Sequence, residues 1–214
     1  MKSNCRIGLL AMAAVLLPGA ARGAVIVANT GIETNGLGPF GSNQLVAAQF
    51  TSPSVATSVT SVDLKHLGFL GVPTFSLRLF SDTAGFPNSS LASLGSQSVG
   101  VAGTYTYTPG APVVLGPATS YWLVADCSNC NVNTLGLWSV SASPPTVVGL
   151  PGANVGTGVA FSIDSGTTWQ ADSQFTFIFQ VNGDTVTNGV PEPGAAVLLG
   201  LGLGATWFAR RRTK

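Results

Sequence analysis

Apolar and polar residues alternate through the middle of the chain, from about residue 25 to residue 186. Phe75, Leu77 and Leu79 occupy every second position of one such stretch, and this two-residue period places successive side chains on opposite faces of a β-strand. β-Branched and aromatic residues are enriched in these stretches, and no helical period of useful length occurs. The pattern predicts strands at residues 24–29, 44–51, 57–67, 74–81, 91–99, 104–108, 120–126, 135–140, 159–163 and 174–181.

Turn residues separate the expected strands. Pro109-Gly110, Gly116-Pro117, Pro144-Pro145 and Pro151-Gly152 all fall in the gaps, where proline presets one backbone angle and glycine accepts unusual ones. Many short strands at this spacing are typical of two antiparallel sheets packed face to face. We therefore predict one all-β domain at residues 25–186, an antiparallel β-sandwich with a jelly-roll-like topology.

The N-terminal end breaks this pattern. A positively charged start and an uncharged apolar stretch at residues 7–17 are followed by Pro18-Gly19 and small residues. Charge, length and order are those of a secretory signal peptide. We expect residues 1–24 to form a signal helix that is removed after export, with cleavage after Ala21 favoured and cleavage two or three residues later as the alternatives.

The C-terminal segment, residues 187–214, has the features of a membrane stop. An apolar run without charges covers residues 195–209, and Arg210, Arg211 and Arg212 follow it. As a helix this run spans roughly 22 Å, so a hydrocarbon core of about 30 Å must thin locally around it. Arginines stay in water or against anionic headgroups. This order predicts a transmembrane helix with its basic tail in the cytoplasm.

Val190-Pro191-Glu192-Pro193, the apolar run and the arginine cluster together resemble the PEP-CTERM sorting signal of Gram-negative bacterial surface proteins. The resemblance implies recognition by an exosortase, a membrane-embedded, cysteine transpeptidase-like enzyme that cleaves near the Pro-Glu-Pro motif. It also implies export by the Sec route, an inner-membrane intermediate, and delivery to the cell envelope or extracellular matrix with its exopolysaccharide and biofilm. The two prolines hold the chain extended, as a processing site requires.

The middle domain has a resemblance of its own. The stretches 49–51, 59–64, 77–87 and 91–94, with the aromatic strand Tyr121-Trp122-Leu123-Val124, are together similar to the choice-of-anchor R type of exported bacterial domain. That resemblance implies a β-sandwich module attached to a C-terminal surface signal. The family has no established biochemical activity, so no site residues follow from it.

Charge is scarce and unevenly placed. The expected domain carries seven acidic side chains and two basic ones, Lys65 and Arg78, a net charge of −5, whereas the +1 of the whole chain comes from its two ends. An acidic surface repels phosphate backbones, so nucleic acid is excluded as a partner.

Cys127 and Cys130 are the cysteines that remain once a signal peptide carrying Cys5 is removed. Exported chains with an even number of cysteines normally oxidise them, so we expect a disulfide that stiffens the turn after strand 120–126. Free thiols, and redox or metal use, remain as alternatives. A redox motif needs a helix at this point, and zinc needs further ligands.

An oxygen-rich loop follows the same strand, with candidate calcium ligands at Asp126, Ser128, Asn129, Asn131 and Asn133. One of these side chains is charged, and the spacing of a calcium-binding helix-loop-helix is absent. Asparagine and serine are also common in plain turns. We therefore predict no metal site and no cofactor.

The sequence contains one histidine, His66, and Asp63 on the same expected strand faces the opposite way. A hydrolytic triad needs a histidine beside an orienting carboxylate, so we predict no catalytic residues. Glycoside hydrolysis needs two carboxylates in one cleft. The candidate carboxylates fall on different strands and turns, at Asp63, Asp82, Asp126, Asp164 and Asp172.

Aromatic side chains are the candidates for binding sugar rings, whose apolar faces stack on them. Tyr105 and Tyr107 share one face of an expected strand as a candidate exposed ladder, and Trp169 is a third candidate. Trp122 and Trp138 lie in apolar strands and are expected in the core. Packing is favoured over ligand binding for the group as a whole.

These features predict an exported, non-enzymatic surface or extracellular-matrix protein, a structural or adhesive component processed by an exosortase. Exopolysaccharide is the expected macromolecular partner besides that enzyme and the inner membrane. The alternatives are a carbohydrate-binding module, which needs a line of exposed aromatic side chains, and a secreted carbohydrate-active hydrolase, which needs a carboxylate pair.

Overall fold

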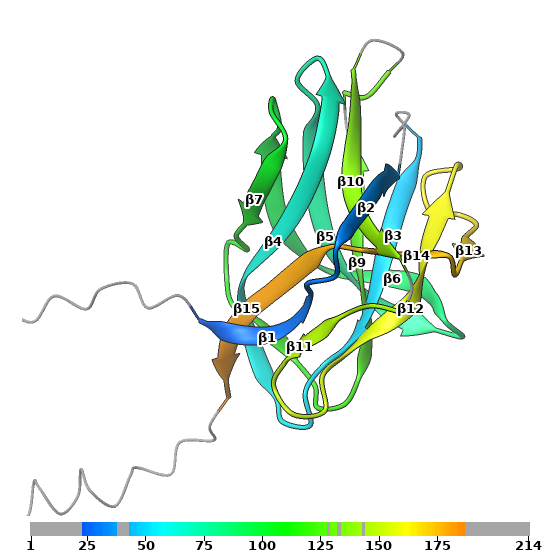
Figure 1. Cartoon of the computed structure of the whole chain (residues 1–214). Coiled ribbons are helices and arrows are strands. Elements are labelled where there is room, and N and C mark those ends of the chain that lie inside the picture. Colours follow the sequence, from blue (N-terminus) through cyan, green and yellow to red (C-terminus); the bar gives the residue numbers. More distant parts are fainter. Residues whose placement is uncertain (1–22, 38–42, 128, 132–133, 143, 187–214) are drawn as a thin grey trace, which may run out of the picture.

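The computed structural model describes residues 23–37, 43–127, 129–131, 134–142 and 144–186, which form fifteen β-strands and no helix. The strands pair antiparallel in two sheets, which pack face to face (Figure 1). The predicted all-β, antiparallel β-sandwich is confirmed.

The larger sheet, sheet A, has nine strands. In spatial order its main path runs β11 (Val147–Gly149), β1 (Ala24–Asn29), β15 (Phe179–Thr185), β4 (Thr57–Leu70), β10 (Leu135–Ala142) and β14 (Phe175–Phe177). Three short strands join this path from outside it: β2 (Glu33–Leu37) pairs with β10, while β7 (Gly103–Tyr107) and β8 (Val113–Leu115) pair with β4.

The smaller sheet, sheet B, has six strands, and its two central strands are the most apolar. Their antiparallel register places Phe50 opposite Tyr121, and their rings lie 5.8 Å apart. In spatial order the sheet runs β13 (Gln170–Asp172), β12 (Asn154–Ser162), β3 (Leu45–Thr51), β9 (Ser120–Cys127), β5 (Thr74–Thr83) and β6 (Phe86–Ser98).

The main core lies between the two sheets and is built from alternate positions of their strands. Phe75, Leu77 and Leu79 are at most 1% exposed, as the two-residue period predicts. Trp138 is fully buried, stacks on Phe177 with ring centroids 4.1 Å apart, and donates a hydrogen bond of 2.8 Å to the Ile178 carbonyl. Its predicted place in the core is confirmed.

A second apolar cluster covers the outer face of sheet B. Three partly buried aromatic side chains, Phe80, Phe86 and Trp169, pack against it. Trp122 is 4% exposed, so it is buried as predicted. Its side chain lies on the outer face of sheet B and not between the two sheets. The buried members of this cluster are Leu45, Ala47, Trp122, Val124 and Ala160.

Each of the ten predicted strands is present, and all except 24–29 differ from the observed strands at one end or both. The clearest difference is the segment 174–181, which is divided into β14 and β15 at Ile178. There the backbone leaves β10, where the Ile178 N–H donates to the Ser139 carbonyl at 2.9 Å, and joins β4 and β1. The pattern missed β2, β8, β11 and β13, which have three to five residues each and are too short to show alternation.

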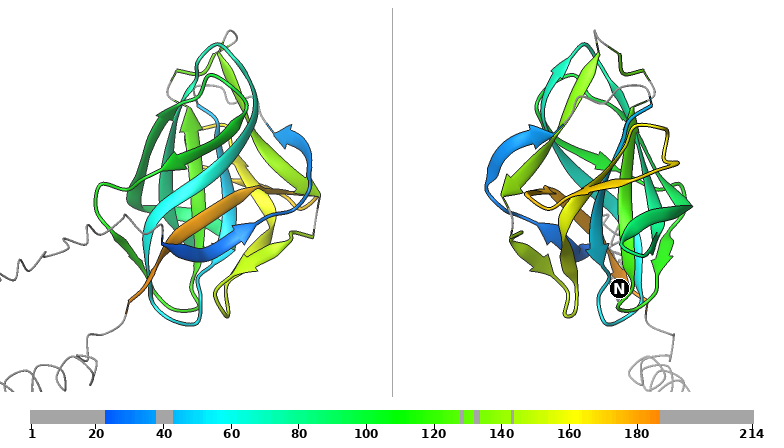
Figure 2. Two further views of the ribbon diagram at one scale, coloured as in Figure 1. Left: turned by 60° about the vertical axis from the view of Figure 1, so that its left-hand side comes forward. Right: turned by 90° about the vertical axis from the view of Figure 1, so that its right-hand side faces the viewer.

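The first and last described strands are neighbours. β1 begins beside the end of β15, with Ala24 opposite Gly183, and Figures 1 and 2 show both strands at one end of sheet A. Residues 1–22 of the predicted signal peptide, the Pro-Glu-Pro motif and the predicted transmembrane helix lie outside the described residues. Among the residues that the structure describes, none forms a membrane-spanning helix.

Candidate functional site

The outer face of sheet A carries a groove made of two adjoining hollows, which we call the polar groove because most of its lining residues are polar, although carbon atoms supply much of their exposed surface. One has a volume of about 170 Å³ and the other about 240 Å³, and both are lined by Asp63 and Gln180. The hollows cross β1, β15, β4 and β7. Their other polar lining residues are Asn29, Thr30, Ser61, Lys65, Thr104, Thr106 and Asn182.

Alternation on neighbouring strands places these side chains in the groove. On β4, Val62 and Leu64 face the core and are fully buried, so Asp63 between them faces outward. The register then places Asp63 opposite Gln180 of β15 on one side and opposite Thr106 of β7 on the other. Three segments that are far apart in the sequence therefore form one polar row.

A hydrogen-bond network fixes the geometry of this row. The Thr106 hydroxyl donates to Asp63 Oδ1 at 2.6 Å, and Asn182 Nδ2 donates to Asp63 Oδ2 at 3.0 Å. Gln180 Nε2 in turn donates to Asn182 Oδ1 at 2.7 Å. Lys65 at the end of the groove forms an ion pair with Glu33. Planar amide and carboxylate groups held in this way are pre-oriented for a hydroxyl-rich ligand, because each presents fixed donors or acceptors.

The prediction of an exposed aromatic ladder is wrong, because Tyr105 and Tyr107 face the core side of sheet A. Tyr107 is fully buried, and its hydroxyl lies 3.2 Å from His66 Nε2. Tyr105 is partly buried and donates a hydrogen bond of 2.8 Å to the Val101 carbonyl. Trp169 packs against the cluster on the other sheet. The structure therefore does not bring the three candidate sugar-binding residues together.

His66 lies in the core at 1% exposure, with its ring centroid 4.8 Å from that of Phe75. Burial lowers the pKa of His66 from its ordinary value of 6.5 to about 4, although a hydrogen bond with the Leu137 backbone acts in the opposite direction. The imidazole is therefore neutral in the folded chain near pH 7. Asp63 lies on the opposite face of β4, as the alternation predicts.

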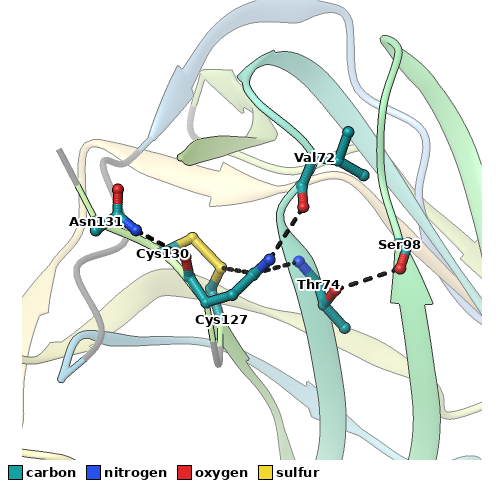
Figure 3. The surroundings of a disulfide bond; sticks show 7 residues. Val72, Thr74, Ser98, Cys127, Cys130 and Asn131 are labelled. Atoms are coloured by element: carbon teal, nitrogen blue, oxygen red, sulfur yellow. Dashed lines mark hydrogen bonds between the residues drawn. A yellow bond between two sulfur atoms is a disulfide. The ribbon is translucent and has the colours of Figure 1, made fainter. Parts of the chain in front are cut away.

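The disulfide between Cys127 and Cys130 is present, with Cα atoms 5.4 Å apart (Figure 3). Asn129 between them binds the neighbouring loop: its Nδ2 donates to the Val72 carbonyl at 3.1 Å, and its Oδ1 accepts the Thr74 N–H at 2.7 Å. The disulfide turn is thereby attached to the start of β5.

The proposed oxygen ligands of that turn have structural partners. Asp126 forms an ion pair of 2.8 Å with Arg78, and the Asn131 side chain donates to the Asn129 carbonyl at 3.3 Å. Ser128 and Asn133 lie outside the described residues. Within the described ranges, no three His, Cys, Asp or Glu side chains gather as a metal site would require.

Asp82 and Asp126 both lie on the outer face of sheet B but are far apart. Asp82 accepts hydrogen bonds from Trp122 Nε1 at 2.6 Å and Gln49 Nε2 at 2.8 Å. The β5–β9 register, with Ser81 opposite Tyr121 and Ser76 opposite Asp126, separates Asp82 from Asp126 by about 20 Å along the strands. The carboxylates of a glycosidase lie within about 10 Å of each other.

The remaining two candidate carboxylates, Asp164 and Asp172, hold loops beside β12 and β13. Asp164 accepts hydrogen bonds from the Thr168 N–H at 2.9 Å, the Thr168 hydroxyl at 2.7 Å and the Ser162 hydroxyl at 2.8 Å. These bonds, with the backbone bond from Thr168 first, lower the pKa of Asp164 to about 2. Asp172 accepts the Gln174 N–H at 2.8 Å.

No protein-family model matches the chain. A search of curated proteins also finds no match. The polar groove brings several side chains together on shared hollows, and the sequence pattern did not predict it.

Proposed function

We propose that this chain is an exported protein of the Gram-negative cell envelope or extracellular matrix, a structural or adhesive component without enzymatic activity. The observation that carries the proposal is the position of the ends of the domain. All fifteen described strands lie between residues 24 and 185, and the first strand begins beside the end of the last. Proteolysis on either side of the domain therefore removes none of the described strands.

The proposed route uses both ends in turn. The signal peptide directs the chain to the Sec pathway, and the apolar run at 195–209 stops in the inner membrane with Arg210, Arg211 and Arg212 in the cytoplasm. An exosortase then cleaves near Pro191-Glu192-Pro193 and releases the domain. The disulfide supports this route, because disulfides form and persist in oxidising compartments.

The strand that leads to the sorting signal is well placed to transmit force. β15 is hydrogen-bonded on both sides, to β1 and to β4, so tension on an attached C-terminal end spreads into the middle of sheet A. The proposal includes a jelly-roll-like connection of the strands and kinship with choice-of-anchor R domains. The antiparallel sandwich and the strand pattern of the sequence support both the connection and the kinship.

The polar groove gives the proposed adhesive role a physical basis. Gln180, Asn182, Asp63 and Thr106 offer amide, carboxylate and hydroxyl groups along one surface, and sugar hydroxyls both donate and accept hydrogen bonds. The groove is lined by one carboxylate, Asp63, which is hydrogen-bonded but forms no ion pair with a described residue. This low charge and the short length of the groove suit a neutral exopolysaccharide. We assign the groove, in place of the tyrosines, to polysaccharide contact.

Intact-mass measurement tests the proposed route. The full chain is produced in a Gram-negative host with and without an exosortase. With the enzyme, the recovered protein should lack the signal peptide and all residues from 195 to 214. A matched variant in which Pro191, Glu192 and Pro193 are all alanine should keep that segment. A mass that includes the segment in the presence of the enzyme contradicts the route, as does a reporter at position 185 found in the cytoplasm.

The rival functions separate on a panel of bacterial polysaccharides. Retention without release of sugar favours the binding role of the groove. Release of soluble sugar supports the secreted hydrolase and contradicts the non-enzymatic proposal. If the chain is not retained and no sugar is released, the chain is a matrix component whose groove does not contact polysaccharide.

A further inference from the structure

An exposed apolar tip lies at one end of the sandwich. We define it as residues 70–73, Leu-Gly-Val-Pro, and residues 99–102, Val-Gly-Val-Ala, which together contain no polar side chain. These residues connect β4 to β5 and β6 to β7. Leu70, Val72 and Val101 are 51%, 59% and 71% exposed. Single exposed apolar residues are ordinary, but a group of them on adjacent loops marks a contact surface.

The two connections form one surface, far from both ends of the described domain. The Val99 N–H donates to the Pro73 carbonyl at 2.9 Å, which holds the connections side by side. β15 pairs with β4 so that Thr185 lies opposite Thr57, where β4 begins, whereas the apolar tip follows the other end of β4. Figures 1 and 2 show this end of β4 opposite the start of β1 and the end of β15. The two ends of the described domain therefore do not cover the tip.

Side chains of the domain bond the backbone of the tip. The Tyr105 hydroxyl donates to the Val101 carbonyl at 2.8 Å and accepts the Val101 N–H at 3.3 Å. On the other connection, Asn129 Nδ2 donates to the Val72 carbonyl at 3.1 Å, beside the disulfide (Figure 3). In water such loops need no protein partners, because solvent bonds an exposed backbone. In a lipid bilayer an unbonded backbone group is costly, so bonds of this kind prepare a loop for insertion.

The two chain segments that contain the tip carry no charge. No Asp, Glu, Lys, Arg or His occurs between His66 and Arg78, or between Asp82 and Asp126. A charge on an inserted loop would have to leave water, which lipid opposes strongly. The tip consists of two turns at the end of a sandwich and is not a flat face. A fluid lipid surface adapts to such a shape, whereas a protein partner needs a hollow that matches it.

We infer that the apolar tip inserts into the surface of a lipid bilayer, with Val72 and Val101 in the apolar boundary beneath the headgroups. The domain carries seven acidic and two basic side chains, so a neutral surface is preferred to an anionic one. Insertion is shallow and reversible, because few apolar side chains take part. This inference goes beyond the proposed function and does not rest on export, sorting or polysaccharide.

Fluorescent labelling of the full chain tests the insertion. In a Cys5→Ser background, Val72→Cys and Val101→Cys chains are labelled with a solvent-sensitive dye and transferred from dodecyl maltoside into phosphatidylcholine vesicles. The matched control is Leu91→Cys, in the middle of β6, where the side chain is 50% exposed. Iodide in the water should quench the labels at 72 and 101 several-fold less than the label at 91. A nitroxide-bearing lipid should give the opposite order.

Two substitutions in the labelled Val72→Cys chain separate insertion from other kinds of protection. Val101→Asp should make the label about ten times more accessible to iodide, since a carboxylate stays in water, whereas Leu91→Asp should have no effect. Tyr105→Phe keeps the apolar surface but leaves the Val101 backbone without its two bonds, so it should raise accessibility by a smaller factor. Thermal melting verifies that the variants are folded.

Three results overturn the inference. The first is equal iodide quenching at 72, 101 and 91. The second is protection of the label at 72 that survives Val101→Asp or Tyr105→Phe. The third is protection that follows the concentration of the chain and not that of the lipid, which identifies a second copy as the partner of the tip.

Discussion

The outer faces of the two sheets are built by the same alternation and differ in what covers them. On sheet B four outward positions of β3 and β9 are apolar and form one buried cluster. Trp122 among them is 4% exposed beneath Phe80, Phe86 and Trp169. On sheet A the outward positions around Asp63 are polar and border open hollows. The first face is therefore part of the folded core, and the second remains available to a ligand.

A loop explains why the apolar face is closed. The connection between β12 and β13 passes close over sheet B: Gly166 has a φ of +91°, and a Cβ atom there would lie 3.1 Å from Leu45 Cδ1. Asp164 holds this loop through its bonds to Thr168 and Ser162. An outward-facing tryptophan on a sheet is therefore not by itself a binding platform, because a neighbouring loop can bury it.

Removal of the Trp122 indole should destabilise the closed face. Trp122→Ala should lower the free energy of unfolding by about 3–5 kcal/mol, since it removes a buried indole and leaves a cavity. It also leaves Asp82 without the Nε1 donor. Urea unfolding measures the loss. Gln180→Ala, on the open face, is the control and should cost less than about 1 kcal/mol; equal losses would show that the two faces do not differ as described.

Acidification should destabilise the folded chain through His66, on the inner face of β4. The pKa of His66 is about 4 in the folded chain and 6.5 in the unfolded chain, so the unfolded chain binds more protons between these values. Stability from a neutral His66 is therefore fully present above pH 6.5 and is lost as the pH falls to 4, by about 3 kcal/mol.

Urea unfolding at pH 7.5 and pH 4 measures this loss, with His66→Gln as the control. The variant keeps a polar side chain near Tyr107 and does not titrate in this range, so its loss on acidification should be smaller by about 3 kcal/mol. Equal losses in the two proteins would place the acid sensitivity elsewhere.

Removing the disulfide tests the connection between the two sheets. Cys127 ends β9 of sheet B, and the chain then continues to β10 of sheet A. Replacing both Cys127 and Cys130 with serine should cost about 2 kcal/mol, the chain-entropy value for a loop this short. Reducing the wild-type protein with dithiothreitol should give a similar loss in urea unfolding. A loss above about 4 kcal/mol would mean that the bridge does more than close its turn.

A small stabilisation is expected at the turn between β5 and β6. Ala84 in the β5–β6 turn has a φ of +54°, which an L-residue with a Cβ adopts at a cost. Ala84→Asn should raise the free energy of unfolding by about 0.5–1 kcal/mol, because asparagine tolerates this conformation. Calorimetry should then show a melting temperature about 2 °C higher, whereas Ala84→Val should lower it.

The sequence pattern predicted the strands but not how they are placed beside one another. Residues 61–65, 104–106 and 180–182 form the groove only because β4 pairs with β7 on one side and β15 on the other, and no local pattern encodes that order. Alternation also distinguishes two faces without saying which is inner. Tyr107 was predicted on an exposed face but lies on the inner one, where its hydroxyl contacts His66. Trp138, without such ambiguity, was assigned correctly.

Affinity electrophoresis through gels cast with a neutral bacterial exopolysaccharide tests the difference between the faces most directly. Wild-type chain should be retarded, and Asp63→Asn combined with Gln180→Ala should weaken binding about tenfold, which corresponds to the loss of one or two hydrogen bonds. Trp169→Ala, on the closed face, should bind like the wild type. Retardation that is lost with Trp169→Ala and kept in the groove variant would contradict the account.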